Sequence, residues 1–224
     1  MYRKLNSYID LSHKKDGSET LDEYLSKAKQ YNTRCVFVNR FQFDYAKEFL
    51  KGTDVIIAGG VNFPLGNESI EAQLADFEDL YKVGFRELEG ELNQYAVKNK
   101  MYDYIERELA ELSIFSNQHG VFSKIILETS EMDFDFLEKV CRMALKFNTP
   151  CLKTSTGYSR CGAELDKVKF MKQILGDKVA IKASGGIKTF EQACEFIDAG
   201  CCCFGATAID DIIAQQEEYF KNHI

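Results

Sequence analysis

Lys153 and Lys182 occupy positions where a charged side chain is costly. Each lies within a short apolar run, near the end of a predicted buried strand and before a glycine-bearing loop. Because an apolar setting removes hydration from an ammonium group, it lowers the pKa of the lysine, and a second ammonium nearby acts in the same direction. The pair indicates amine chemistry, in which one neutral lysine attacks a carbonyl carbon and the other keeps that lysine's pKa low.

The elements that carry these lysines alternate between strand and helix along the whole chain. Strands are predicted at Tyr8–Ser12, Cys35–Asn39, Asp54–Phe63, Phe85–Gly90, Ser123–Glu128, Pro150–Thr156, Lys178–Ser184 and Cys202–Thr207. Apolar residues at three- and four-residue spacing predict helices that include Leu21–Ala28, Ala72–Tyr81, Tyr102–Phe115, Leu137–Leu145, Leu165–Ile174, Phe190–Ile197 and Ile209–Tyr219. Eight such units in 224 residues favour a parallel (β/α)₈ barrel, with an open doubly wound sheet as the alternative.

The chain is predicted to form one barrel domain over residues 1–224, because it has two prolines and no linker-like segment. In such barrels, catalytic groups come from the carboxyl ends of the strands and the loops that follow. Lys153 and Lys182 end consecutive strands, which lie about 4.8 Å apart in a sheet. Their ammonium groups are therefore expected to lie close together.

The composition of the chain indicates which kinds of binding partner and which cellular compartment to expect. A net charge of −7 without a basic face argues against nucleic-acid binding, so local groups must hold any anionic substrate. We expect no membrane partner, because no apolar run reaches the length of a signal peptide or a membrane span. The eight cysteines form no C-x-x-C pair, and we expect free thiols in a reducing cytoplasm, without metal or cofactor.

Three motifs in the second half of the chain resemble a known family. They are Lys153-Thr154-Ser155-Thr156-Gly157, Lys182-Ala183-Ser184-Gly185-Gly186-Ile187 and Phe204-Gly205-Ala206-Thr207, and they are similar to the catalytic half of the deoxyribose-phosphate aldolases. Weaker matches cover nearly all of the remaining chain: Tyr8-Ile9-Asp10, Val38-Asn39, Phe63-Pro64-Leu65-Gly66 and Lys124–Ser130.

The resemblance implies a class I aldolase, a lyase that interconverts 2-deoxy-D-ribose 5-phosphate with acetaldehyde and glyceraldehyde 3-phosphate. It assigns the Schiff base to Lys153, assistance to Lys182 and proton relay to Glu89. It places the substrate, a phosphorylated sugar or aldehyde, against Asp10, Ser12, Asn39, Thr154, Gly157, Gly185, Gly186, Gly205 and Thr207. Glycine also lets backbone N–H groups approach a phosphate, although it is common in loops that merely turn the chain. Dimers are frequent in this family, so a homodimer is expected.

Two departures from the family leave alternatives open. Glu89 stands where the family has aspartate, and Glu87 and Glu91 share its side of the strand, so either could be the relay instead. Ala208 stands where the family commonly has a second serine. The alternatives are a Schiff-base aldolase for a different phosphorylated or short aldehyde, and a sugar-phosphate-binding barrel with weak turnover.

Overall fold

Eight parallel strands close into a barrel in the computed structural model, which describes residues 2–14 and 16–223. The strands are β1 (Ile9–Leu11), β2 (Cys35–Phe37), β3 (Ile56–Val61), β4 (Glu87–Glu91), β5 (Phe122–Ile126), β6 (Cys151–Lys153), β7 (Ala180–Ser184) and β8 (Cys203–Ala206). Each pairs with the next along the chain, and β8 pairs with β1. The predicted barrel is confirmed and the open sheet was wrong. The ends of the predicted domain, Met1 and Ile224, lie outside the described residues.

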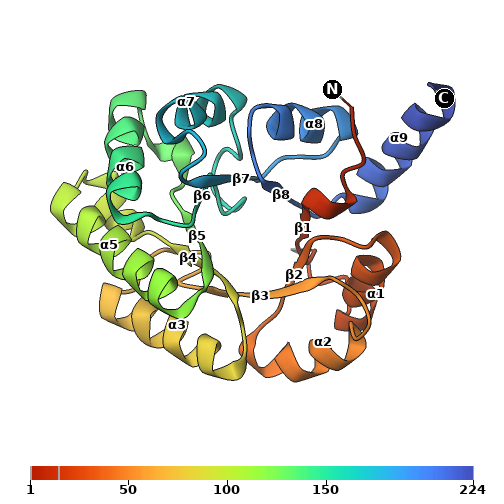
Figure 1. The fold of residues 1–224 in the computed structure, drawn as a ribbon, viewed down its shortest axis with the longest axis horizontal. Helices are drawn as coiled ribbons and strands as arrows, with labels where there is room; N and C mark the ends of the chain where they lie inside the picture. Colours follow the sequence, from red (N-terminus) through yellow and green to blue (C-terminus); the bar gives the residue numbers. More distant parts are fainter. Residues whose placement is uncertain (1, 15, 224) are drawn as a thin grey trace.

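Helices surround the ring of strands (Figure 1). They are α1 (Leu21–Tyr31), α2 (Phe43–Phe49), α3 (Ile70–Val83), α4 (Gln94–Lys98), α5 (Tyr102–His119), α6 (Phe134–Phe147), α7 (Leu165–Leu175), α8 (Phe190–Asp198) and α9 (Ile209–Asn222). The sequence did not predict α2 and α4. These helices have seven and five residues, so neither completes two turns, and no apolar period can develop over that length.

Side-chain caps fix where several helices begin and end. Thr20 and Glu23 form a reciprocal capping box at the start of α1, and the Asp133 carboxylate accepts from the Phe136 N–H at the start of α6. Asn32 and Asn148 adopt left-handed backbone conformations after α1 and α6, which ends those helices. The chain then turns directly into β2 and β6, so the caps set where these strands enter the barrel.

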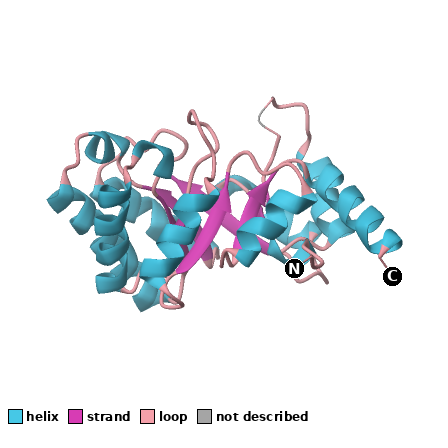
Figure 2. Cartoon of the chain, turned by 90° about the horizontal axis from the view of Figure 1, so that it is seen from above, coloured by secondary structure: helices cyan, strands magenta, loops and turns pink. Residues whose placement is uncertain are grey.

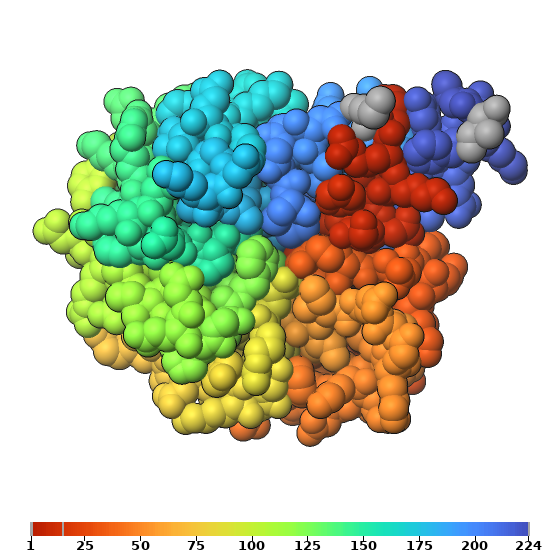
Figure 3. Space-filling model, viewed as in Figure 1, coloured from red at the N-terminus to blue at the C-terminus, as the bar shows by residue number. Residues whose placement is uncertain are grey.

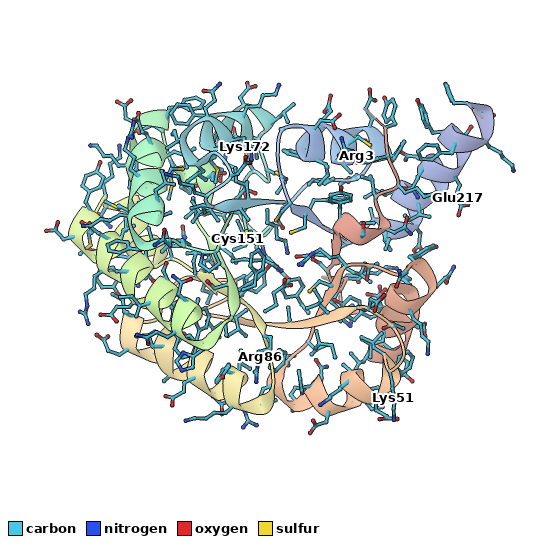
Figure 4. The ribbon with its side chains drawn as sticks, in the orientation of Figure 1. Arg3, Lys51, Arg86, Cys151, Lys172 and Glu217 are labelled. Carbon is cyan, nitrogen blue, oxygen red and sulfur yellow. The ribbon has the colours of Figure 1, made fainter. Side chains whose placement is uncertain are left out.

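Strand register brings the two lysines to the same level. Lys153 of β6 pairs with Lys182 of β7, and Ile126 of β5 pairs with Lys153. Alternate residues such as Leu152, Ile181 and Phe204 are buried in the apolar layer between strands and helices. Side chains fill the middle of the barrel in Figure 4, where Cys151 lies at the inner side of β6.

The two ends of the chain meet at the closing edge of the barrel. The Gln216 side chain on α9 accepts from the Leu5 N–H at 2.6 Å and donates to Asn6 at 3.1 Å. In Figure 3 the N-terminal segment accordingly lies beside the C-terminal residues. Among residues 2–14 and 16–223, no helix combines the length and apolar character that crossing a bilayer requires.

All eight cysteines are free, and six of them are buried. In the run Cys201-Cys202-Cys203, the first and third thiols are buried and the middle one is exposed, as expected where adjacent side chains face opposite ways.

Candidate active site

A cavity of about 520 Å³ lies at the carboxyl ends of the strands. Loops extend beyond the strands on this part of the molecule in Figure 2. The predicted residues that line the cavity are Ser12, Asn39, Glu89, Lys153, Gly157, Gly185, Gly186, Gly205 and Thr207. Most of the residues suggested by sequence alone are therefore brought together at one opening of the barrel.

Glu89 lies between the two lysines at the floor of this cavity. Its Oε2 accepts from Lys153 Nζ at 2.6 Å, and its Oε1 accepts from Lys182 Nζ at 2.6 Å. Lys153 and Lys182 are 4% and 1% exposed, so solvent screens these contacts little. The Phe63 ring lies 5.4 Å from Lys153 Nζ, and the Phe37 ring lies 4.5 Å from Lys182 Nζ. Aromatic faces therefore flank both cations.

A second ionic layer lies beneath the lysines. Lys124 Nζ donates to Asp10 at 2.8 Å and to Glu87 at 2.9 Å, and the Arg34 guanidinium donates to the same two carboxylates. Asp10 also accepts from Lys182 Nζ at 2.7 Å, which joins the two layers. The sequence analysis missed Arg34 and Lys124 as parts of the site. Lys124 could have been found, because it lies within the predicted buried strand Ser123–Glu128, just as Lys153 lies within an apolar run.

Burial and neighbouring charges set the pKa of each group in this network. Burial lowers the pKa of Lys153 and the Lys182 ammonium adds to the effect, while Glu89 opposes it. For Lys182, burial acts in the same direction, but Asp10 and Glu89 outweigh it and raise the pKa above its ordinary value. Burial would raise the pKa of Glu89, yet Lys153 and Lys182 together lower it to about 2.

The network carries one more positive than negative group when every member is ionised. The cations are Arg34, Lys124, Lys153 and Lys182, and the anions are Asp10, Glu87 and Glu89. Lys182 and Lys124 each donate to two carboxylates, whereas the ion pair described for Lys153 is with Glu89 alone. Loss of one proton from Lys153 therefore balances the network with the smallest loss of ion pairing.

Asp10, Cys35 and Glu87 come close enough together to resemble a metal-ligand set. Both carboxylates, however, already bind Arg34 and Lys124. A metal ion would have to displace these cations from the buried layer. We therefore interpret this cluster as an ion-pair network.

Glycine-rich loops form the other end of the cavity. Gly157, Gly185 and Gly186 adopt left-handed backbone conformations, with φ of +80°, +89° and +77°. A Cβ on Gly185 would lie 3.1 Å from the Gly157 Cα, so glycine permits the loops after β6 and β7 to touch. Lys188 also lines this end, and α9 begins directly after Ala208, whose side chain provides no cap.

Three predicted residues lie beneath or behind the cavity wall. Asp10 and Lys182 are buried in the ionic layers described above. The Thr154 hydroxyl exchanges hydrogen bonds with the Ser184 backbone, at 3.3 Å to the carbonyl and 3.1 Å from the N–H. Thr154 is therefore placed to hold β6 against β7.

Several lining residues were not predicted, among them Phe37, Phe63, Tyr158 and Lys188. Phe63 was predicted as the last residue of a strand and noted in a family match, but β3 ends at Val61 and Phe63 lies in the loop that follows. Tyr158 follows Gly157 directly, and its ring meets the Phe63 ring edge-on, with centroids 5.5 Å apart. This contact joins loops 95 positions apart in the chain, which no local pattern reveals.

Curated relatives identify the family. A deoxyribose-phosphate aldolase from Aciduliprofundum boonei is 34% identical over 217 residues, which cover 96% of this chain and 98% of the relative. One from Lactobacillus acidophilus is 35% identical over 182 residues, covering 81% of this chain and 77% of the relative. The chain belongs to the deoxyribose-phosphate aldolase family.

The fold agrees with this deoxyribose-phosphate aldolase assignment. The solved structure of QR15, an aldolase, superposes with a TM-score of 0.83 at 28% identity, covering 98% of this chain and 97% of that one. No protein-family model matches the chain. The family resemblance first seen in the lysine motifs therefore extends along the whole barrel.

Proposed function

We propose that this aldolase cleaves 2-deoxy-D-ribose 5-phosphate to acetaldehyde and glyceraldehyde 3-phosphate, and also runs the reverse reaction, through a Schiff base on Lys153. The observation that carries the proposal is the ionic network under the cavity, in which Lys153 alone combines a lowered pKa with access to the cavity. A neutral amine is the nucleophilic form, and it must lie where a substrate carbonyl can reach it.

In the cleavage direction, Lys153 Nζ bonds to the aldehyde carbon, and loss of water leaves an iminium. The iminium at the first carbon withdraws electrons as the bond between the second and third carbons breaks. The hydroxyl group on the third carbon gives up its proton, and this carbon becomes the aldehyde carbon of glyceraldehyde 3-phosphate. The enamine that remains takes a proton on carbon, and water then releases acetaldehyde from Lys153. No metal or cofactor enters any of these steps.

Glu89 is our choice for the group that moves these protons. It contacts Lys153 and lines the cavity, so it can exchange protons with both the amine and a substrate. Glu87 lies in the lower layer against Arg34 and Lys124, and Glu91 lines a different cavity. The geometry therefore favours Glu89 over its two neighbours on the strand.

The loops after β6, β7 and β8 are the proposed phosphate site. Gly157, Gly185 and Gly186 let backbone N–H groups approach the anion, and the loops after strands seven and eight commonly bind phosphate in such barrels. Thr207 lines the cavity, and α9 begins two residues after it, so the N–H groups of its first turn are proposed to add to the phosphate site. Ser12 and Asn39, which also line the cavity, are assigned to the substrate hydroxyl groups.

The direct test is aldehyde release from 2-deoxyribose 5-phosphate with EDTA present. We expect metal-independent turnover that disappears in Lys153→Met. A protein that binds the sugar phosphate without releasing aldehyde would instead be a binding barrel, and the proposal would be wrong.

A second candidate, an aldolase for another phosphorylated or short aldehyde, is favoured by Glu89 and by the uncapped start of α9 at Ala208. The variant Glu89→Asp separates the two. A fall in activity on 2-deoxyribose 5-phosphate would show that the barrel is adapted to the longer side chain and to this substrate. A rise would indicate that the native residue serves a different aldehyde.

We further propose that residues 1–224 work as one domain, in the cytoplasm and as a homodimer. Free cysteines support the compartment, because thiols persist where the environment is reducing. Light scattering coupled to gel filtration tests the dimer, and a monomeric mass at micromolar concentration would contradict it.

A further inference from the structure

A second cavity, of about 470 Å³, lies beside the active-site cavity. Thr156 and Tyr158 line both cavities. Phe63 lines the first, and Pro64, the next residue in the chain, lines the second. The edge-on contact between Phe63 and Tyr158 therefore lies where the two spaces adjoin.

The charged groups of this second space are mostly acidic, and we call it the acidic cavity. Its charged lining residues are Glu91, Glu128, Glu131 and Lys98. Glu91 and Glu128 are 1% and 3% exposed, whereas Glu131 and Lys98 are exposed residues. The single cation therefore lies towards solvent, and the buried part of the lining is anionic.

Two carboxylate oxygens in this lining are buried without a protein partner. Glu91 Oε2 and Glu128 Oε1 make no hydrogen bond to any of the described residues. The other oxygen of Glu128, in contrast, is paired. It accepts hydrogen bonds from the Thr156 N–H at 3.2 Å and from the Thr156 hydroxyl at 2.6 Å. Buried carboxylate oxygens are usually paired, so the two unpaired ones point to a donor that arrives with a ligand.

Neighbouring charges also favour a cationic occupant. Burial and then the negative charge of Glu128 raise the pKa of Glu91 to about 8; Glu108 on α5 adds to the rise, and Lys153 on β6 opposes it. A positive charge placed between Glu91 and Glu128 would remove their mutual repulsion. Glu91 would then give up its proton as the cation binds.

Size and spacing distinguish an organic cation from a metal ion. A metal site needs at least three ligand atoms close together. Among the described residues, the one group whose ligand atoms lie within 4.8 Å of one another is Asp10, Cys35 and Glu87. The glutamates of the acidic cavity are therefore not close enough together to form such a group. The cavity volume also exceeds what a bare ion fills. An ammonium group offers three N–H donors on one centre, which suits two separated carboxylates.

We propose that the acidic cavity binds the ammonium group of a short aliphatic amine, paired with Glu91 and Glu128. The carbon chain of the ligand lies towards Thr156 and Tyr158, at the wall shared with the active site. This site goes beyond the aldolase reaction, because binding an amine requires neither Lys153 nor a carbon–carbon bond.

Calorimetric titration with butylammonium chloride at constant ionic strength tests the site, with 1-butanol as the neutral analogue of equal length. We expect butylammonium to bind at least about tenfold more tightly than butanol. We also expect Glu91→Gln to weaken butylammonium binding about tenfold or more, since an amide offers no negative charge. Binding at pH 7 should release protons, seen as a heat that changes with the ionisation enthalpy of the buffer.

Glu48→Gln is the matched control, because it makes the same carboxyl-to-amide change at an exposed position on α2 outside the cavity. It should leave butylammonium binding unchanged. If Glu91→Gln fails to fold, as judged by thermal melting, Glu131→Gln at the exposed side of the cavity takes its place and should weaken binding several-fold.

Three results would overturn the proposal. The first is equal binding of butylammonium and butanol. The second is butylammonium binding that neither Glu91→Gln nor Glu131→Gln weakens. The third is saturable Mg²⁺ binding that Glu91→Gln abolishes while butylammonium fails to bind, which would make the cavity a metal site. The titration involves no turnover, so its failure and a failure of the proposed aldolase activity remain distinguishable.

Discussion

Three glutamates follow one face of β4, and each has different surroundings. Glu87 pairs with Arg34 and Lys124 in the lower layer, and Glu89 pairs with Lys153 and Lys182 below the active-site cavity. Glu91 lies in the acidic cavity with an unpaired oxygen. The same side chain is therefore a structural counter-ion, a group placed to move protons and a carboxyl with a raised pKa, according to its partners.

Glu89→Gln is expected to separate imine formation from proton transfer at carbon. Glu89 opposes the lowering of the Lys153 pKa, so its removal should shift imine formation towards lower pH and not abolish it. Loss of the base should reduce turnover about 100-fold or more, together with deuterium exchange into the acetaldehyde methyl group. NMR exchange and a pH profile of imine formation measure both effects. Full exchange in the variant would exclude Glu89 as the relay.

Glu91→Gln is expected to stabilise the protein at alkaline pH. Glu91 has a pKa of about 8 when folded and an ordinary value of 4.5, so between these pH values the unfolded chain has released a proton that the folded protein retains. Folding stability contributed by Glu91 therefore falls as pH rises through this window. At pH 9 the variant should be more stable by about 1–3 kcal/mol. Denaturant unfolding at pH 5 and pH 9 measures the difference, and a gain that is equal at both would contradict this sign.

At the scale of elements, the proposed phosphate site lies where the carboxyl ends of the strands meet the helices that follow them. Thr189 caps α8 by accepting from the Gln192 N–H, whereas Ala208 leaves the start of α9 without a side-chain cap. An uncapped first turn keeps its N–H groups available to an anion. A serine there would add a hydroxyl donor beside Thr207.

Ala208→Ser is expected to lower KM for 2-deoxyribose 5-phosphate about threefold to tenfold, because one added hydrogen bond to a charged phosphate contributes roughly 1 kcal/mol. The unphosphorylated sugar, 2-deoxyribose, serves as the control, and its kcat/KM should stay unchanged. Equal improvement for both substrates would show that the serine acts by capping α9 and not on the phosphate.

Sequence reasoning predicted the long elements, the two active-site lysines and their partners Glu89 and Asp10, but not the cations of the lower layer. All eight strands were predicted from short runs that recur between turns and helical segments, and Lys153 and Lys182 stood out because they interrupt apolar runs. Arg34 and Lys124 were missed, since their partnership with Asp10 spans 24 and 114 residues and exists only once the barrel closes. Sequence alone also could not choose between Glu89 and Glu91 as the proton relay, because both lie on one face of β4. The structure separates them, since Glu89 lines the active-site cavity and Glu91 lines the acidic cavity.

At the scale of the whole molecule, the barrel holds an ionic network that draws on β1 and β4–β7 and on Arg34 next to β2. Removing one partner of a buried ion pair typically destabilises a folded protein by about 3–5 kcal/mol. Closure of the barrel and pairing of these charges therefore depend on each other. The fold thereby maintains an excess of positive charge that only Lys153 can relieve beside the substrate cavity. Charges contributed by several strands, and not a local motif, therefore surround the Lys153 amine, whose pKa burial and Lys182 lower.

The most direct test of this account is to trap the imine with borohydride in the presence of 2-deoxyribose 5-phosphate and to locate the adduct by peptide mass spectrometry. The account predicts a single adduct on Lys153, which is absent in Lys153→Met and forms only at higher pH in Lys182→Met, where the ammonium that lowers the Lys153 pKa is missing. An adduct on Lys182 or Lys124, or an active enzyme that traps none, would contradict it.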